Sequence, residues 1–209
     1  MDVSDLFSPN AAWAIAVISI AALLALLVHA LAFGVAAFLT RRRPEMAFLE
    51  GHATRAIRGP ARLFLPAISA YLVLPLVSGR LPEATVVVLG HVLYVLMTAS
   101  VGWLMIGLAT LATYVATRRH DIESTDNLMA RKVITQAAIL RRLLIVMISV
   151  ITLSIILMRF EDFRQLGTGL LASAGVAGLI IGFAAQRTLG NVLAGIQIAI
   201  TQPIRVDDV

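Results

Sequence analysis

The sequence predicts an all-α integral membrane fold with five transmembrane helices. Of the 209 residues, 59% are hydrophobic and 14% are charged, whereas soluble domains average about 45–50% apolar and about 25% charged residues. The apolar residues also form five long runs that contain no Asp, Glu, Lys or Arg, and a spanning helix needs roughly 20 apolar residues. The runs cover residues 11–40, 63–79, 84–117, 143–158 and 167–186.

The first run, 11–40, is long enough to tilt in the bilayer or to protrude from it. The ten residues before it are acidic and contain no positively charged stretch, so they do not resemble a cleavable signal peptide. We interpret residues 1–10 as a tail on the exterior side. The arginine-rich linker after the run is expected either to lie along the membrane surface or simply to set the topology.

The second run, 63–79, is short and contains Pro66 and Pro75. It is expected to be the least regular span, because prolines free carbonyl groups that neighbouring helices must satisfy. In the third run we take His91 as the only ionisable group well inside a span. No acidic partner lies within the spans, so we expect a neutral His91 that packs between helices and bonds to a backbone carbonyl. A proton pathway is the alternative.

The segment between the third and fourth runs is expected to be an amphipathic helix that continues into the fourth span. Ser124, Thr125 and Asp126 are plausible caps for its start, and the apolar residues after them recur at helical spacing. Residues 11–164 would then form a lipid-facing region of four helices that senses the membrane.

The arginines predict the orientation of the chain. The linkers after the first and third runs contain twelve Arg and Lys residues, against three on the opposite side, namely Arg80, Arg159 and Arg164. Cytoplasmic loops carry the excess of positive charge. The amino terminus is therefore expected outside and the carboxyl terminus in the cytoplasm.

The fifth run is rich in Gly and Ala. On a helical wheel with 100° per residue, a mainly apolar stripe lies between two edges of small residues. The stripe consists of Thr168, Ala172, Val176, Leu179, Phe183, Gln186 and Gly190. One edge consists of Gly175, Gly178 and Gly182, and the other of Ser173, Ala177 and Ala184, interrupted by the bulkier Ile180.

Small residues let helices approach closely in lipid. Two unlike edges favour a head-to-tail contact between copies, and such contacts close into a ring when the rotation permits. Leu179 and Phe183 would then face the axis of an apolar pore. An ordinary helix-packing seam is the alternative explanation of the same residues.

A change of direction is predicted after the fifth run. Arg187 ends the apolar residues, and Leu189, Val192 and Ile196 begin a second amphipathic stretch. We expect the helix to break between Arg187 and Gly190, so that its second half lies flat under the membrane. Residues 165–201 are thus interpreted as a pore helix followed by an interfacial helix.

Residues 175–209, GVAGLIIGFAAQRTLGNVLAGIQIAITQPIRVDDV, closely resemble the signature of the small-conductance mechanosensitive ion channel family. The Gly/Ala helix, the Gln, LGNVLAG and QPIRVDD occur in order. The resemblance implies a larger, five-span member that forms a homoheptamer in the bacterial inner membrane. It further implies that Leu179 and Phe183 close a weakly selective pore, which membrane tension opens to release solutes on hypo-osmotic shock. Residues 202–209 would begin a cytoplasmic β domain whose remainder is absent from this sequence.

The chain departs from the family at the kink. The family places a glycine directly after the Gln, where this chain has Arg187. Gly190 is therefore expected to act as the hinge, with Asn191 capping the helix that follows. Arg187 is expected to face the phosphate-bearing interface, and a mild anion preference of the pore is the alternative.

The sequence indicates no enzyme. It contains no cysteine, which excludes disulfides and thiolate metal sites, and it shows no metal-ligand spacing, nucleophile–base pair or phosphate loop. No cofactor and no nucleic acid are expected. The expected partners are further copies of the chain, membrane lipids, and permeating ions and small solutes. A secondary transporter with a broken helix near mid-membrane and a non-conducting membrane scaffold are the alternatives to a channel.

Overall fold

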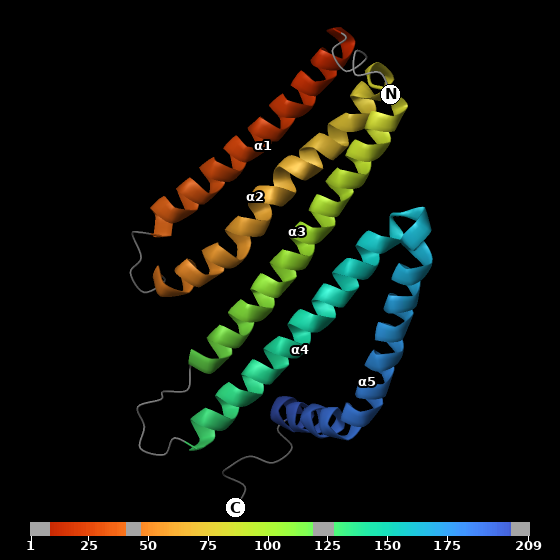
Figure 1. Ribbon diagram of the computed structural model, residues 1–209. Helices are drawn as coiled ribbons and strands as arrows, with labels where there is room; N and C mark the ends of the chain where they lie inside the picture. The colour runs from red at the N-terminus through yellow and green to blue at the C-terminus, as the bar shows by residue number, and fades with distance from the viewer. Residues whose placement is uncertain (1–8, 41–46, 119–127, 202–209) are drawn as a thin grey trace, which may run out of the picture.

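A computed structural model describes residues 9–40, 47–118 and 128–201. In these ranges the chain forms five long α-helices and two short 3-10 helices, with no strand (Figure 1). Of the tail predicted at residues 1–10, residues 1–8 lie outside the described residues, as do the predicted caps Ser124, Thr125 and Asp126 and the expected start of a β domain at 202–209. The long helices are α1 (Pro9–Thr40), α2 (Ala47–Val77), α3 (Glu83–Arg118), α4 (Leu128–Met158) and α5 (Arg164–Thr201).

Each of the five helices is long and apolar enough to cross a membrane, which confirms the predicted number of helices that are candidates for spans. Helices α2 and α4 begin well before the predicted apolar runs. α2 begins at Ala47, so the second half of the first linker belongs to this helix, and α4 begins at Leu128 and continues into the fourth span as predicted. Helices run on past the apolar segments because Ala, Arg, Lys and Leu are all strong helix formers.

The predicted irregularity of the second span does not interrupt its helix. α2 contains Pro60, Pro66 and Pro75 and stays helical through all three. The Ser69 hydroxyl lies 2.9 Å from the Pro66 carbonyl oxygen and 3.3 Å from that of Ala21 on α1. Ser69 therefore adds a polar contact between α1 and α2 next to Pro66, but the carbonyl that Pro66 frees is that of Arg62, four residues earlier.

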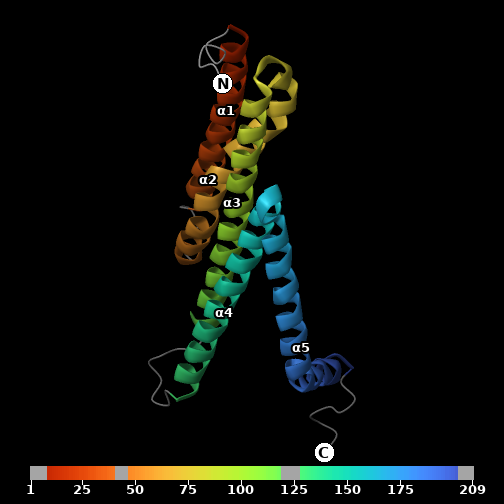
Figure 2. The ribbon, with the colours of Figure 1, turned by 45° about the vertical axis from the view of Figure 1, so that its right-hand side comes forward.

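Helices that follow one another in the sequence pack against one another (Figures 1 and 2). α1 to α4 lie side by side, and a small core of Ala67, Ala70, Leu74 and Leu93 joins α2 to α3. Most large apolar side chains are exposed, Leu72 at 67% and Val88 at 62% among them. Such a surface suits a lipid environment rather than water. We call the end with Pro9 and Arg80 the upper end and the end with Thr40 and Arg118 the lower end.

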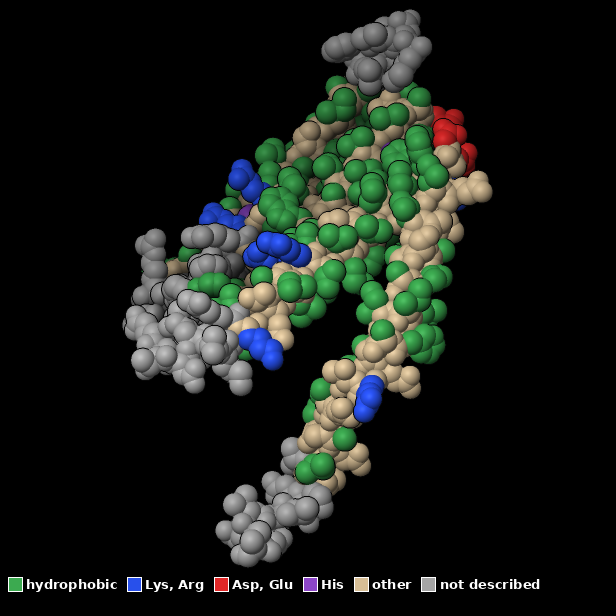
Figure 3. Space-filling view, turned by 60° about the horizontal axis from the view of Figure 1, so that its bottom comes forward, with side chains coloured by type: hydrophobic (Ala, Val, Ile, Leu, Met, Phe, Trp, Pro, Cys, Tyr) green, Lys and Arg blue, Asp and Glu red, His purple; other side chains and the backbone are tan. Residues whose placement is uncertain are grey.

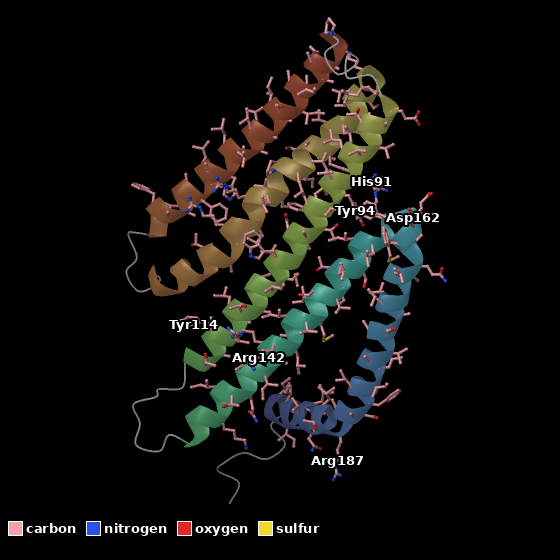
Figure 4. The ribbon with its side chains drawn as sticks, viewed as in Figure 1. His91, Tyr94, Tyr114, Arg142, Asp162 and Arg187 are labelled. Atoms are coloured by element: carbon pink, nitrogen blue, oxygen red, sulfur yellow. The ribbon has the colours of Figure 1, made fainter. Side chains whose placement is uncertain are left out.

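The α4–α5 pair is displaced toward the lower end relative to α1–α3. The turn between α4 and α5 lies beside the upper third of α3: the Phe160 ring stacks on His91 at 5.2 Å, and the Arg159 guanidinium lies 5.4 Å from the centre of the Tyr94 ring (Figure 4). At 1.5 Å per residue, His91 lies about 12 Å along the axis from the start of α3 at Glu83. The polar upper end of α4–α5 is therefore about 12 Å lower than that of α2–α3.

The basic residues that end the apolar segments at the lower end show the same displacement between the two helix groups. Arg58 and Arg62 of α2 flank Gly59, which packs on Trp103 of α3. Arg141 of α4 instead shares a pocket with Thr110 to Thr117, centred about ten residues, or about 15 Å, further along α3. In Figure 3, Lys and Arg side chains stand among apolar ones toward the lower end, and the visible acidic side chains lie toward the opposite end. The apolar segments of the two helix groups thus form a step.

Candidate functional site

α5 contacts the rest of the chain along one narrow face. Gly167 is buried, and Ala174 and Ala185 are half-buried, at spacings of 7 and 11 residues that fall on one side of a helix. Gly167 allows the closest approach, because a Cβ atom there would lie 2.6 Å from the Ser154 carbonyl oxygen of α4. Below this contact α4 and α5 diverge, which both ribbon views show (Figures 1 and 2).

The apolar stripe predicted for α5 lies outside this contact. Leu179 is 63% exposed and Phe183 is 73% exposed. Leu179 follows Ala174 by five residues, or about 140° around the helix, so the stripe points away from α4. The remaining stripe residues, Thr168, Ala172, Val176, Gln186 and Gly190, are exposed as well. The chain therefore does not bury these side chains within itself.

Both edges of small residues are also left uncovered by the chain. No atom lies within 4 Å of the Cβ position at Gly175, Gly178 or Gly182, beyond the helix's own backbone and chain neighbours. On the other edge Ser173, Ala177 and Ala184 are exposed, and the Ser173 hydroxyl donates to the Gly169 carbonyl within the helix at 2.8 Å. Neither edge is therefore covered by another helix within the part of the chain that the structure describes.

The predicted break after the apolar run is wrong in one respect. α5 is helical without interruption from Arg164 to Thr201, because no proline removes an amide donor in this range. The helix bends instead, and Arg187 lies at the bend with its side chain pointing away from the other helices (Figure 4). Gly190 and Asn191 follow within the same helix, so Asn191 does not start a new one.

The histidine prediction is partly right. Nδ1 of His91 lies 2.7 Å from the Val87 carbonyl oxygen, and this acceptor requires a proton on Nδ1. His91 is not the only ionisable group in a span, however. His29 of α1 is 4% exposed, its Nε2 lies 3.1 Å from the Arg58 carbonyl oxygen of α2, and its ring contacts Phe33 at 4.6 Å. Its position inside the first apolar run was the signal that the prediction missed.

Within the described ranges, no group of three His, Cys, Asp or Glu side chains could hold a metal ion. No protein-family model, curated protein or solved structure matches the chain. The assignment of function therefore rests on the residues of α5 and on the arrangement of the helices that carry it.

Proposed function

We propose that the chain is the protomer of a mechanosensitive, weakly selective ion channel. In this proposal α5 helices from several copies, a homoheptamer by the motif in residues 175–209, surround the pore. Leu179 and Phe183 form its constriction. The arginine distribution favours an exterior amino terminus and a cytoplasmic carboxyl terminus, and the resemblance of residues 175–209 favours a bacterial inner membrane. Release of ions and small solutes on hypo-osmotic shock is the proposed physiological role.

The observation that carries the proposal is the uncovered surface of α5. The helix is apolar enough to span a membrane, yet its most apolar 18-residue window is 0% buried within the chain. Glycine is a poor partner for lipid tails but an effective one for another helix, because it lets two backbones come close. Three glycines on one edge with nothing within 4 Å are best explained by a neighbouring copy that covers them.

The pattern also favours a ring over a simple pair. The glycine edge and the Ser173, Ala177 and Ala184 edge differ, so the contact that uses both is head-to-tail, and repetition of that contact closes into a ring. The stripe between the edges then faces the axis. A narrow apolar ring stops ions by dewetting, and α5 has no Asp or Glu that would make the pore strongly cation-selective.

The step between the two helix groups offers a way to couple the pore to tension. A flat bilayer cannot cover two apolar segments displaced by about 12 Å without a local change in thickness or slope, and such mismatch costs free energy. Tension favours whichever state occupies more membrane area, as a ligand favours the state it binds better. A movement of α1–α3 relative to α4–α5 that reduces the step would therefore be favoured under tension.

The test is electrical recording from the full-length protein reconstituted in liposome patches. We expect single-channel currents that appear with applied pressure, carry cations and anions, and do not saturate with any one solute. Saturable, substrate-specific flux would favour a transporter. Patches that stay silent under pressure, with correctly assembled oligomers present, would contradict the proposal.

A further inference from the structure

A pocket of about 630 Å³ lies between α2, α3 and α4 toward their lower ends. Trp103 and Ile106 line its upper part and Ile134 its apolar wall, and Arg141 and a row of hydroxyl groups supply the polar part. At its upper end α2 and α3 come close, since a Cβ atom at Gly107 would lie 2.8 Å from the Ala56 carbonyl oxygen. The volume falls within the range of small-ligand pockets, about 300–1,000 Å³.

Arg141 is incompletely satisfied in this pocket. Its Nε atom is buried and has no hydrogen-bond partner within the part of the chain that the structure describes. A buried donor without a partner is costly, and more so when it carries charge. The adjacent Arg142 is exposed and does not line the pocket. The two arginines differ in surroundings although they are neighbours in sequence.

The hydroxyl groups of the pocket come from one stripe of α3. The Thr110 hydroxyl donates to the Ile106 carbonyl at 2.9 Å, that of Thr113 to the Thr110 carbonyl at 2.9 Å, and that of Thr117 to the Thr113 carbonyl at 3.0 Å. Since each hydrogen is directed to the backbone, the threonine oxygens keep lone pairs that accept hydrogen bonds. The pocket therefore combines one cation with several acceptors.

This combination defines the ligand. The guanidinium group is best satisfied by an anionic oxygen that accepts its hydrogen bonds. The threonine oxygens are best satisfied by a hydroxyl or amine group that donates to them. None of the described residues that line the pocket is Asp or Glu, so an ammonium group would meet Arg141 with no carboxylate among them to compensate its charge. We propose that the pocket binds phosphatidylglycerol, with its phosphate on Arg141 and its glycerol hydroxyls on the threonines.

The position of the pocket along the helix axes suits a lipid that belongs to the lower leaflet of the membrane. Arg141 marks the lower polar boundary of α4, where lipid phosphates are expected, and Trp103 and Ile106 lie one to two helical turns above Thr110 to Thr113 on α3. The acyl chains would run upward along these apolar side chains. The lipid would then occupy the step between the lower ends of α2 and α4. This inference is independent of whether the protein conducts ions.

The tryptophans allow a direct test. Trp103 lines the pocket, and the other tryptophan, Trp13, lies at the upper end under the Arg80 guanidinium at 3.8 Å. In a Trp13→Phe background, the fluorescence of Trp103 is measured in bilayers that contain phosphatidylglycerol with brominated acyl chains, which quench nearby tryptophan. Brominated phosphatidylcholine and brominated phosphatidylethanolamine serve as the competing lipids.

We expect phosphatidylglycerol to be preferred near Trp103 by about tenfold, or about 1.4 kcal/mol, because the phosphates of the other two lipids carry a cation that would lie beside Arg141, whereas the glycerol of phosphatidylglycerol is neutral and donates to the threonines. Arg141→Gln should remove most of this preference, and Arg142→Gln should retain it. Thr113→Val preserves the shape of the side chain and should lower the preference for phosphatidylglycerol over phosphatidylcholine, whose headgroup has no hydrogen-bond donor, about threefold. Equal quenching by all three lipids in the parent protein would overturn the inference. An equal loss in Arg142→Gln would also overturn it, because it would indicate general surface attraction.

Discussion

The contact between Gly167 and α4 allows a prediction with a matched control two residues away. A Cβ atom at Gly167 would lie 2.6 Å from the Ser154 carbonyl oxygen and 2.9 Å from the Met158 amide nitrogen. Both are backbone atoms and cannot rotate away. At Gly169 no atom lies within 4 Å of the same position, so Gly169→Ala places a methyl group in open space on the same turn of α5.

Both substitutions raise the helix propensity of α5, but only Gly167→Ala overpacks the contact with α4. Ala stabilises a helix relative to Gly by about 0.8–1 kcal/mol, and both variants gain this. Gly167→Ala must also push α5 from α4 by about 0.8 Å to restore ordinary contact, and overpacking of this kind costs about 1–3 kcal/mol. We therefore expect Gly167→Ala to undock α5 more easily than Gly169→Ala by about 1–3 kcal/mol.

The assay is energy transfer between one label on α4 and one on α5, followed while SDS is titrated into mixed micelles. The chain contains no cysteine, so a pair of introduced cysteines carries both labels. The midpoint for Gly167→Ala should fall below that for Gly169→Ala. Identical midpoints would refute the argument, since they would mean that Gly167 does not support the α4–α5 contact.

Three further substitutions test other parts of the account. Gly178→Leu should leave the fold of one chain intact, because nothing lies within 4 Å, but should prevent copies from associating; unchanged cross-linking in membranes would contradict this. Phe183→Ser should open at lower tension or leak at rest in patch recordings, whereas an unaltered threshold would argue against a constriction there. His29→Leu should weaken the α1–α2 contact by about 1 kcal/mol through loss of the bond to the Arg58 carbonyl, measured by SDS titration. In the same titration His91→Leu, which loses a hydrogen bond to the Val87 carbonyl within α3, should have the smaller effect, and equal shifts would count against this assignment.

The spans could be predicted because apolar runs and charged linkers are local signals. The early start of α4 was also predicted, from the helical spacing of its apolar residues, but the start of α2 at Ala47 was not, because the residues from Ala47 to Arg62 favour helix without forming an apolar run. The bend of α5 near Arg187 was placed correctly, but its continuous helix was not, since neither Gly190 nor Arg187 removes a backbone donor.

The step between helix groups and the pocket at Arg141 depend on how helices are aligned along one another. The stacking of Phe160 on His91 and the contact of Gly102 with Thr152 set that alignment, and neither is a local pattern. Arg141 and Arg142 have the same chemistry and adjacent positions, so their different surroundings follow only from the tertiary packing of α3 against α4. The same reason explains why the partner of His29 was not foreseen.

Cysteine accessibility along α5 tests the central claim most directly, because the protein has no cysteine of its own. Phe183→Cys and Ile181→Cys place a thiol on opposite sides of the helix. A charged, water-soluble thiol reagent applied while pressure holds the channel open should alter the current through Phe183→Cys and leave that through Ile181→Cys unchanged. The reverse pattern, or equal insensitivity of both variants in conducting patches, would contradict a pore lined by the Leu179 and Phe183 stripe.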